Sequence, residues 1–207
     1  MLYQILLDAK LEPSIISGAG LTSIIKEGKI GNAKVGAGEW LVIEADESDG
    51  SIVQYKPEVG LLLNVDKDHK EIEALMEIFA TFKNNTQKLF VVNQSNALAK
   101  KLSENIANDF AVDENSAAGY VAKNFMQNEL QISFWVNNVS FELHQVGKHN
   151  MENALAAIAV ANQIGVPLNI CADALENYEG IYRRHQVLGN KNGVWMIDDY
   201  AHNPAKC

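Results

Sequence analysis

Apolar residues recur every three to four positions in several stretches of the chain, which predicts helices that each bury one face. These stretches are 1–10, 71–82, 95–106, 151–164 and 168–178. Gly165 and Pro167 follow the helix over 151–164, as expected, because glycine favours the position after a helix and proline cannot continue one. Ser95 supplies a side-chain oxygen that could cap the helix over 95–106.

Shorter apolar runs predict strands, and they are of two kinds. Unbroken runs, typical of parallel strands covered on both faces, are Trp40–Ile43, Val59–Val65 and Leu89–Val92. Two further pairs flank residues that accept a positive φ, which predicts hairpins. These pairs are Leu130–Trp135 with Val139–His144 around Asn137-Asn138, and His185–Leu188 with Val194–Ile197 around Asn192-Gly193.

The alternation of strands and helices predicts an α/β fold: a mostly parallel sheet flanked by helices, with an antiparallel hairpin. The run Val194–Ile197 is apolar throughout and requires cover that residues 1–184 do not provide in the predicted order of elements. We therefore expect 1–184 to form the main domain and 185–207 to begin a C-terminal domain. The chain is then expected to be a piece of a larger protein.

Composition narrows the classes of partner. The 207 residues are 47% hydrophobic and 21% charged, with a formal net charge of −9. Such a charge argues against nucleic acid or an anionic membrane as a partner. Cys171 and Cys207 form no disulfide or metal pattern, and the opening MLYQILLDAK has no features of a signal peptide. We expect a cytoplasmic protein.

Acidic and imidazole side chains follow two predicted strands at the ends where open α/β sheets bind ligands. Glu44, Asp46, Glu47 and Asp49 follow the first strand, and Asp66, Asp68 and His69 follow the second. Oxygen ligands with one imidazole suit Mg²⁺ or Mn²⁺ shared with phosphate groups. The alternative is that these residues form solvated loops.

Three more segments could bind a phosphate or another ligand. In Gly147–Asn153, Asn150 could cap the following helix and Asn153 would lie on the same face. A cap alone would also explain Asn150. Arg183-Arg184 follows the last complete helix and could hold phosphate or simply be solvated, while Asp198–Pro204 is a polar run after a strand.

Taken in order, these segments resemble the successive motifs of the Mur ligase superfamily. The matching strings are EADESD (44–49), NVDKDH (64–69), GKHNMEN (147–153), Arg183-Arg184 and DDYAHNP (198–204). The resemblance spans nearly the whole chain, and the string EADESD is most similar to the alanine-adding members. It implies a P-loop-type central domain that uses ATP and Mg²⁺, with UDP-N-acetylmuramate and L-alanine as substrates.

The resemblance also implies roles for single residues. Glu44 and His69 would hold Mg²⁺, and His149, Asn150 and Asn153 would face the nucleotide and the reacting groups. Arg184 would hold phosphate, and Asp199 and His202 would contact the ribose or adenine. The implied reaction forms an acyl phosphate on the UDP-N-acetylmuramate carboxylate, which the amine of L-alanine then attacks.

Some features depart from the family pattern. No G-x-x-x-x-G-K-[ST] phosphate loop occurs in the chain, so we expect the chain alone to be inactive. Asn203 stands where the alanine-adding members often have histidine, and Lys83 does not align with the modified lysine of sister enzymes. The alternatives are a tripeptide-recycling Mur-type ligase, a folate polyglutamate ligase, and a non-catalytic acidic module that binds a metal or nucleotide.

Overall fold

The computed structural model describes residues 1–66 and 71–200 of the chain and confirms the α/β class. The α-helices are α1 (Leu2–Asp8), α2 (Thr22–Lys26), α3 (Ile72–Asn85), α4 (Lys148–Gln163) and α5 (Leu168–Glu176). Short 3-10 helices are η1 (Ser51–Gln54), η2 (Ala99–Leu102) and η3 (Ile106–Asn108). The strands are β1 (Ser14–Ile16), β2 (Ala33–Lys34), β3 (Leu41–Ile43), β4 (Val59–Leu62), β5 (Leu89–Val92), β6 (Phe110–Ala111), β7 (Tyr120–Val121), β8 (Lys123–Asn128), β9 (Gln131–Val136), β10 (Val139–Leu143), β11 (Gln186–Lys191) and β12 (Val194–Asp198).

Parallel pairing joins the strands that alternate with helices. β1 pairs with β3, β4 with β5, and β6 with β7, while a parallel bridge between Asn93 and Phe110 links β5 to β6. β2 adds to β1 in the antiparallel direction. The predicted hairpin is part of a three-stranded antiparallel sheet in the order β10-β9-β8.

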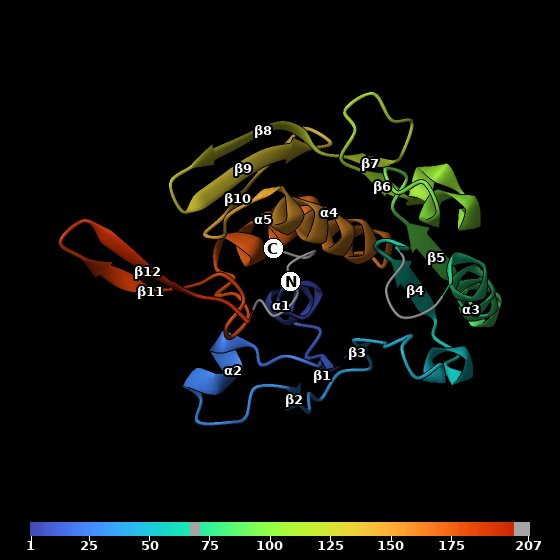
Figure 1. The fold of residues 1–207 in the computed structure, drawn as a ribbon, viewed down its shortest axis with the longest axis horizontal. Coiled ribbons are helices and arrows are strands. Elements are labelled where there is room, and N and C mark those ends of the chain that lie inside the picture. The colour runs from blue at the N-terminus through green and yellow to red at the C-terminus, as the bar shows by residue number, and fades with distance from the viewer. Residues whose placement is uncertain (67–70, 201–207) are drawn as a thin grey trace.

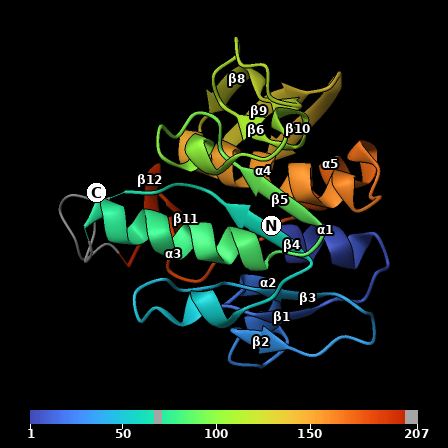
Figure 2. The ribbon, with the colours of Figure 1, turned by 90° about the vertical axis from the view of Figure 1, so that its right-hand side faces the viewer.

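α4 lies at the centre of the molecule, between the antiparallel sheet and α1 (Figures 1 and 2). Every residue from Ala154 to Ala161 is buried, so the helix is apolar on all sides and contacts neighbours all round. Its small alanines let α1, α5 and β9 approach closely, and Phe134 and Phe141 stack above it with ring centroids 5.6 Å apart. This core fixes the position of the N-terminal turn of α4.

Both predicted hairpins are confirmed. The turns use Asn137 and Asn138 with φ of 47° and 67°, and Asn192 and Gly193 with φ of 55° and 80°. The first hairpin packs on the core, whereas β11 and β12 project away from the remaining elements (Figure 1). Trp195 on β12 is 48% exposed.

The predicted helix over 95–106 is wrong. The chain forms η2 and η3 instead, and Ser95 accepts hydrogen bonds from the backbone of Val112 and Asp113 rather than capping a helix. The hydroxyl of Ser103 donates to the buried carboxylate of Asp109. This contact with a residue outside the predicted helix accompanies the break in helical structure at Ser103, between η2 and η3.

The prediction that Trp40–Ile43 is a buried strand is also wrong in part. β3 spans Leu41–Ile43, and Leu41 and Ile43 are 50% and 38% exposed. Val42 points to the opposite face and packs against the core. In the described chain β3 pairs only with β1, so it lies at the edge of its sheet.

Candidate functional site

Glu44 lies directly after β3, where its carboxylate is tied to the end of the neighbouring strand. Oε2 accepts hydrogen bonds from the hydroxyl of Ser17 at 2.7 Å and from the backbone of Gly18 at 2.8 Å. The side chain is exposed, and Oε1 receives no hydrogen bond from the residues that the structure describes. Oε2 of Glu44 is therefore held at the end of β1, and Oε1 could bind a cation or a polar ligand.

The predicted metal partner, His69, lies outside the described residues, so its distance from Glu44 stays a prediction. In residues 1–66 and 71–200, no group of three or more His, Cys, Asp or Glu side chains could hold a metal ion. An ion at Glu44 would thus depend on further ligands. Mg²⁺ fits this requirement, because it commonly takes one or two carboxylates and completes its shell with water and substrate phosphates.

The N-terminal turn of α4 carries the GKHNMEN segment, but Asn150 is not its cap. The helix begins at Lys148 with Gly147 as the N-cap, at a φ of 87° that glycine accepts readily. The amide of Asn150 instead donates to the carbonyl of Val146 at 2.8 Å and lies 3.2 Å from Nε2 of His149. Asn153 is exposed about one turn further along the helix.

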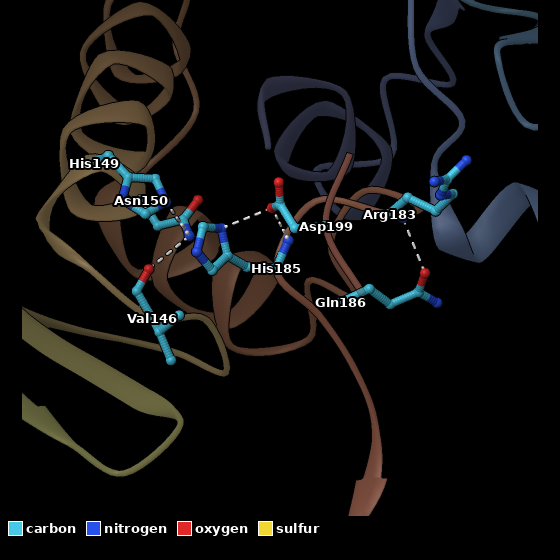
Figure 3. A network of polar contacts seen from close by, with 7 residues as sticks. All are labelled: Val146, His149, Asn150, Arg183, His185, Gln186 and Asp199. Carbon is cyan, nitrogen blue, oxygen red and sulfur yellow. Dashed lines mark hydrogen bonds and ion pairs between the residues drawn. The ribbon is translucent and has the colours of Figure 1, made fainter. Parts of the chain in front are cut away.

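The segment that leads into β11 and the residue after β12 meet beside this turn (Figure 3). The Nδ1 atom and the backbone N–H of His185 lie 3.1 and 2.8 Å from Oδ2 of Asp199. The ring of His185 lies next to that of His149, with centroids 5.4 Å apart and planes inclined at 42°. His185 thus connects the predicted site residues His149 and Asp199.

The two arginines lie next to Tyr200 at the base of the hairpin. The guanidinium of Arg183 is 5.0 Å from the centre of the Tyr200 ring, and that of Arg184 is 5.9 Å from it. Arg183 also pairs with Asp198 at 3.5 Å, and in Figure 3 it lies on the other side of Asp199 from the histidines. Arg184 is exposed and available to an anion.

The electrostatic environment keeps His149 neutral near pH 7. Partial burial of the ring and the adjacent His185 lower the pKa of His149 below its ordinary 6.5, while Asp199 and Glu152 act in the opposite direction. A neutral imidazole can accept as well as donate a hydrogen bond, which suits contact with a polar ligand.

The structure therefore brings together His149, Asn150 and Asp199 and places Arg184 at the base of the same hairpin, while the ligand roles of these residues stay predictions. Glu44 forms its hydrogen bonds separately, at the end of β1. His202, like His69, lies outside the described residues. Sequence reasoning missed His185, although its place directly after the paired arginines marked it as part of the same segment.

Comparison with known proteins identifies the family to which the chain belongs. The family described as "Mur ligase middle domain" matches residues 18–161, and the chain belongs to this Mur ligase family. The chain is 33% identical to UDP-N-acetylmuramate–L-alanine ligase of Synechocystis, over 98% of the chain and 40% of that protein. The corresponding ligase of Microcystis aeruginosa is 31% identical, over 98% of the chain and 43% of that protein.

Solved structures agree with this assignment. The UDP-N-acetylmuramate-alanine ligase MurC from Thermotoga maritima has a TM-score of 0.86 at 25% identity, covering 99% of this chain and 48% of the other. The murein peptide ligase of Psychrobacter arcticus has a TM-score of 0.71 at 22% identity over the same 99% of this chain and 49% of the other. The chain spans about two fifths of the length of the curated relatives. Within the described residues, no helix combines the length and apolarity needed to cross a membrane.

Proposed function

We propose that this chain is the central part of an ATP-dependent ligase that joins L-alanine to UDP-N-acetylmuramate in peptidoglycan synthesis. The observation that carries the proposal is the match to alanine ligases along 98% of the chain, together with the fold likeness to a ligase of that name. The protein would act in the cytoplasm, where both substrates and ATP are found, with neither nucleic acid nor membrane as a partner.

Glu44 would take part in binding the metal. Ser17 and Gly18 hold one of its oxygens in place, the other oxygen could bind the metal, and His69 would supply a further ligand. A bound Mg²⁺ would offset the negative charge that develops on the transferring phosphoryl group.

The N-terminal turn of α4 and the hairpin base would bind the nucleotide. His149, Asn150 and Asn153 present neutral donors and acceptors, and the backbone N–H groups of the turn favour anionic groups. Arg184 would hold phosphate, and Asp199 and His202 would accept hydrogen bonds from or donate them to the ribose or adenine. These residues would align ATP so that its γ-phosphoryl group meets the substrate carboxylate.

The reaction would proceed in two steps. The carboxylate of UDP-N-acetylmuramate attacks the γ-phosphorus of ATP, which forms an acyl phosphate and releases ADP. The amine of L-alanine then attacks the acyl carbon and gives up a proton to solvent, an amide bond forms, and phosphate leaves with the electrons of the broken C–O bond. Fixed donors and cations around the phosphoryl group lower the barrier by stabilising charge that builds in the transition state.

The test is made on the complete ligase, purified as wild type and as Glu44→Ala, His69→Ala and Glu39→Ala. ADP release is measured with UDP-N-acetylmuramate and either L-alanine or the tripeptide L-alanyl-γ-D-glutamyl-meso-diaminopimelate. We expect turnover with L-alanine, a loss of roughly 100-fold or more in the first two variants, and no loss in Glu39→Ala, whose exposed carboxylate follows no strand end.

Thermal melting of each variant separates chemistry from folding. Glu44 is exposed, so its removal opens no cavity and should leave the melting temperature within a few degrees of the wild type. Faster turnover with the tripeptide than with L-alanine would replace this function with that of a recycling ligase. Normal rates in both Glu44→Ala and His69→Ala would show that the acidic segment is a solvated loop.

A further inference from the structure

His185 stands between two groups for which the proposed function already gives a nucleotide-binding role. We propose that His185 is a positioning residue: it holds Asp199 beside the N-terminal turn of α4, and so completes the nucleotide site from the hairpin side. This inference rests on the proposed function for the identity of the ligand. The contact between His185 and Asp199 is observed independently of that function.

The first line of support is the double contact with Asp199. Both the ring Nδ1 and the backbone N–H of His185 meet the same oxygen, Oδ2, at 3.1 and 2.8 Å. Two donors on one atom fix the carboxylate in direction as well as in distance. The ring donor therefore adds a second constraint to the one that the backbone N–H supplies.

The second line of support is the contact with α4. The rings of His185 and His149 lie 5.4 Å apart at 42°, and the amide nitrogen of Asn150 lies 3.2 Å from Nε2 of His149. Asp199 and Asn150 are thus joined through the two imidazoles in one continuous group (Figure 3). Since α4 is fixed by the core and the hairpin projects from it, His185 sets where the hairpin base meets the helix.

The third line of support is the backbone. Arg183 and His185 both adopt positive φ, 56° and 45°, although neither is glycine. Such conformations persist where surrounding contacts require them. Here the strain turns the His185 side chain toward α4 while the Arg183 side chain points away from it (Figure 3).

Three titratable groups interact electrostatically with His149. Asp199 faces it from the end of β12, His185 from the segment before β11, and Glu152 from α4 itself. Substitutions of His185 can remove the ring, the Nδ1 donor or both. Comparing them separates the effect of ring packing from that of hydrogen bonding.

The experiment uses His185→Ala, His185→Phe and His185→Asn, with His144→Ala as the matched control, because His144 is an exposed histidine at the end of β10. Amide hydrogen exchange at position 185 is measured first and corrected for the intrinsic rate of each residue. We expect exchange roughly fivefold faster in the Ala and Phe variants, because Asp199 loses its second donor and releases the backbone N–H. Asn keeps a donor near the place of Nδ1 and should stay near the wild type.

The second measurement is steady-state kinetics of the complete ligase with ATP varied. We expect the KM for ATP to rise on the order of tenfold in the Ala and Phe variants, with kcat nearly unchanged, and to return toward the wild type in His185→Asn. His144→Ala should match the wild type in both measurements. A residue with a merely structural role would lower kcat and stability together and would show no rescue by asparagine.

The outcomes are distinct. Unchanged exchange in His185→Ala, or a Phe variant that behaves like the wild type, would overturn the positioning role, since ring packing alone would then suffice. An equal change in His144→Ala would overturn it as well. A wild-type ligase that consumes no ATP would refute the proposed function and the nucleotide role together, whereas the exchange data would still show whether His185 holds Asp199.

Discussion

The side-chain amide of Asn93 donates a hydrogen bond to the carboxylate of Glu152, and this contact ties the end of β5 to the N-terminal part of α4. Asn93 is only 1% exposed, and its own oxygen accepts a hydrogen bond from the backbone of Ser95 at 2.9 Å. Glu152 lies between Asn150 and Asn153 in sequence. The contact therefore fixes the turn that carries the proposed nucleotide-binding residues.

We predict that Asn93→Ala lowers the free energy of unfolding by about 1–3 kcal/mol, because it leaves the backbone N–H of Ser95 and the carboxylate of Glu152 without this buried partner. Urea unfolding of the chain measures the change. Glu104→Ala serves as the control: it removes the ion pair of the exposed Glu104 with the partly buried Lys83 at 3.7 Å and should cost less than about 0.5 kcal/mol. Equal losses in the two variants would contradict the role assigned to Asn93.

A second prediction concerns pH. The folded chain lowers the pKa of His149 below 6.5, chiefly through burial and His185. Below pH 6.5 the unfolded chain therefore binds a proton at this position that the folded chain does not, so stability falls as the pH drops from about 6.5 through the lowered folded pKa. Above about pH 6.5 neutral His149 contributes its full share to the stability of the folded chain.

The comparison of wild type with His149→Gln isolates this effect from the other titrating groups. Urea midpoints are measured at intervals from pH 7.5 to pH 5. We expect the wild type to lose more stability over this range than His149→Gln, which cannot take up the proton. A steeper loss in the variant would mean that the folded pKa of His149 is raised instead.

The sequence correctly predicted turns and helix ends whose conformation depends on the residues at those positions. The turns at Asn137-Asn138 and Asn192-Gly193 formed as expected, because their residues accept positive φ whatever packs around them. Gly165, with a φ of 101°, ends α4 for the same reason. Glu44 and Asp199 directly follow strands β3 and β12, which their apolar runs predicted, whereas the ligand roles of Glu44, Asn150 and Asp199 stay predictions.

Contacts between distant residues account for the errors. The helix predicted over 95–106 gave way to η2 and η3 because Ser103 and Gln94 bond to Asp109. Nothing in the local pattern shows a buried carboxylate six residues further on. His185 was missed for a similar reason: its function depends on Asp199, fourteen positions away in the sequence, across a hairpin.

Asp109 supports a third prediction. It is fully buried, and it accepts hydrogen bonds from the backbone of Val92 at 2.9 Å, from the amide of Gln94 at 2.6 Å and from the hydroxyl of Ser103. We predict that Asp109→Ala lowers the free energy of unfolding by roughly 2–4 kcal/mol, since one buried and two partly buried donors lose their acceptor. The control is Asp113→Ala, which removes an exposed acceptor of the Asn115 backbone. A loss below about 1 kcal/mol in urea unfolding of Asp109→Ala would mean that water replaces the carboxylate.

The fourth prediction is that the 207-residue chain alone releases no phosphate from ATP. It contains no G-x-x-x-x-G-K-[ST] loop, whose backbone N–H groups and lysine would hold the β- and γ-phosphates. Phosphate release is compared for the chain, for its Glu44→Ala variant and for buffer. Release above the buffer value that disappears in the variant would show that the chain is catalytically complete.

The last prediction concerns residues 185–207, which we propose begin a separate C-terminal domain. In the structure Val194, Trp195, Met196 and Ile197 of β12 are each at least 48% exposed, and the hairpin projects from the main domain (Figure 1). The hairpin of β9 and β10 has the same kind of turn, but Phe134 and Phe141 bury it against the core. An isolated two-stranded hairpin is only marginally stable in water, so the two hairpins should differ in stability although their local sequences are similar in type.

Hydrogen exchange tests this directly, with β9 and β10 as the internal reference. In the 207-residue chain we expect the amides of β11 and β12 to exchange at least tenfold faster than those of β9 and β10, because their opening exposes no core. In the complete ligase the difference should largely disappear, since further chain would cover the apolar face of β12. Slow exchange of β11 and β12 in the 207-residue chain would show instead that the hairpin belongs to the main domain and that the proposed boundary at residue 184 is wrong.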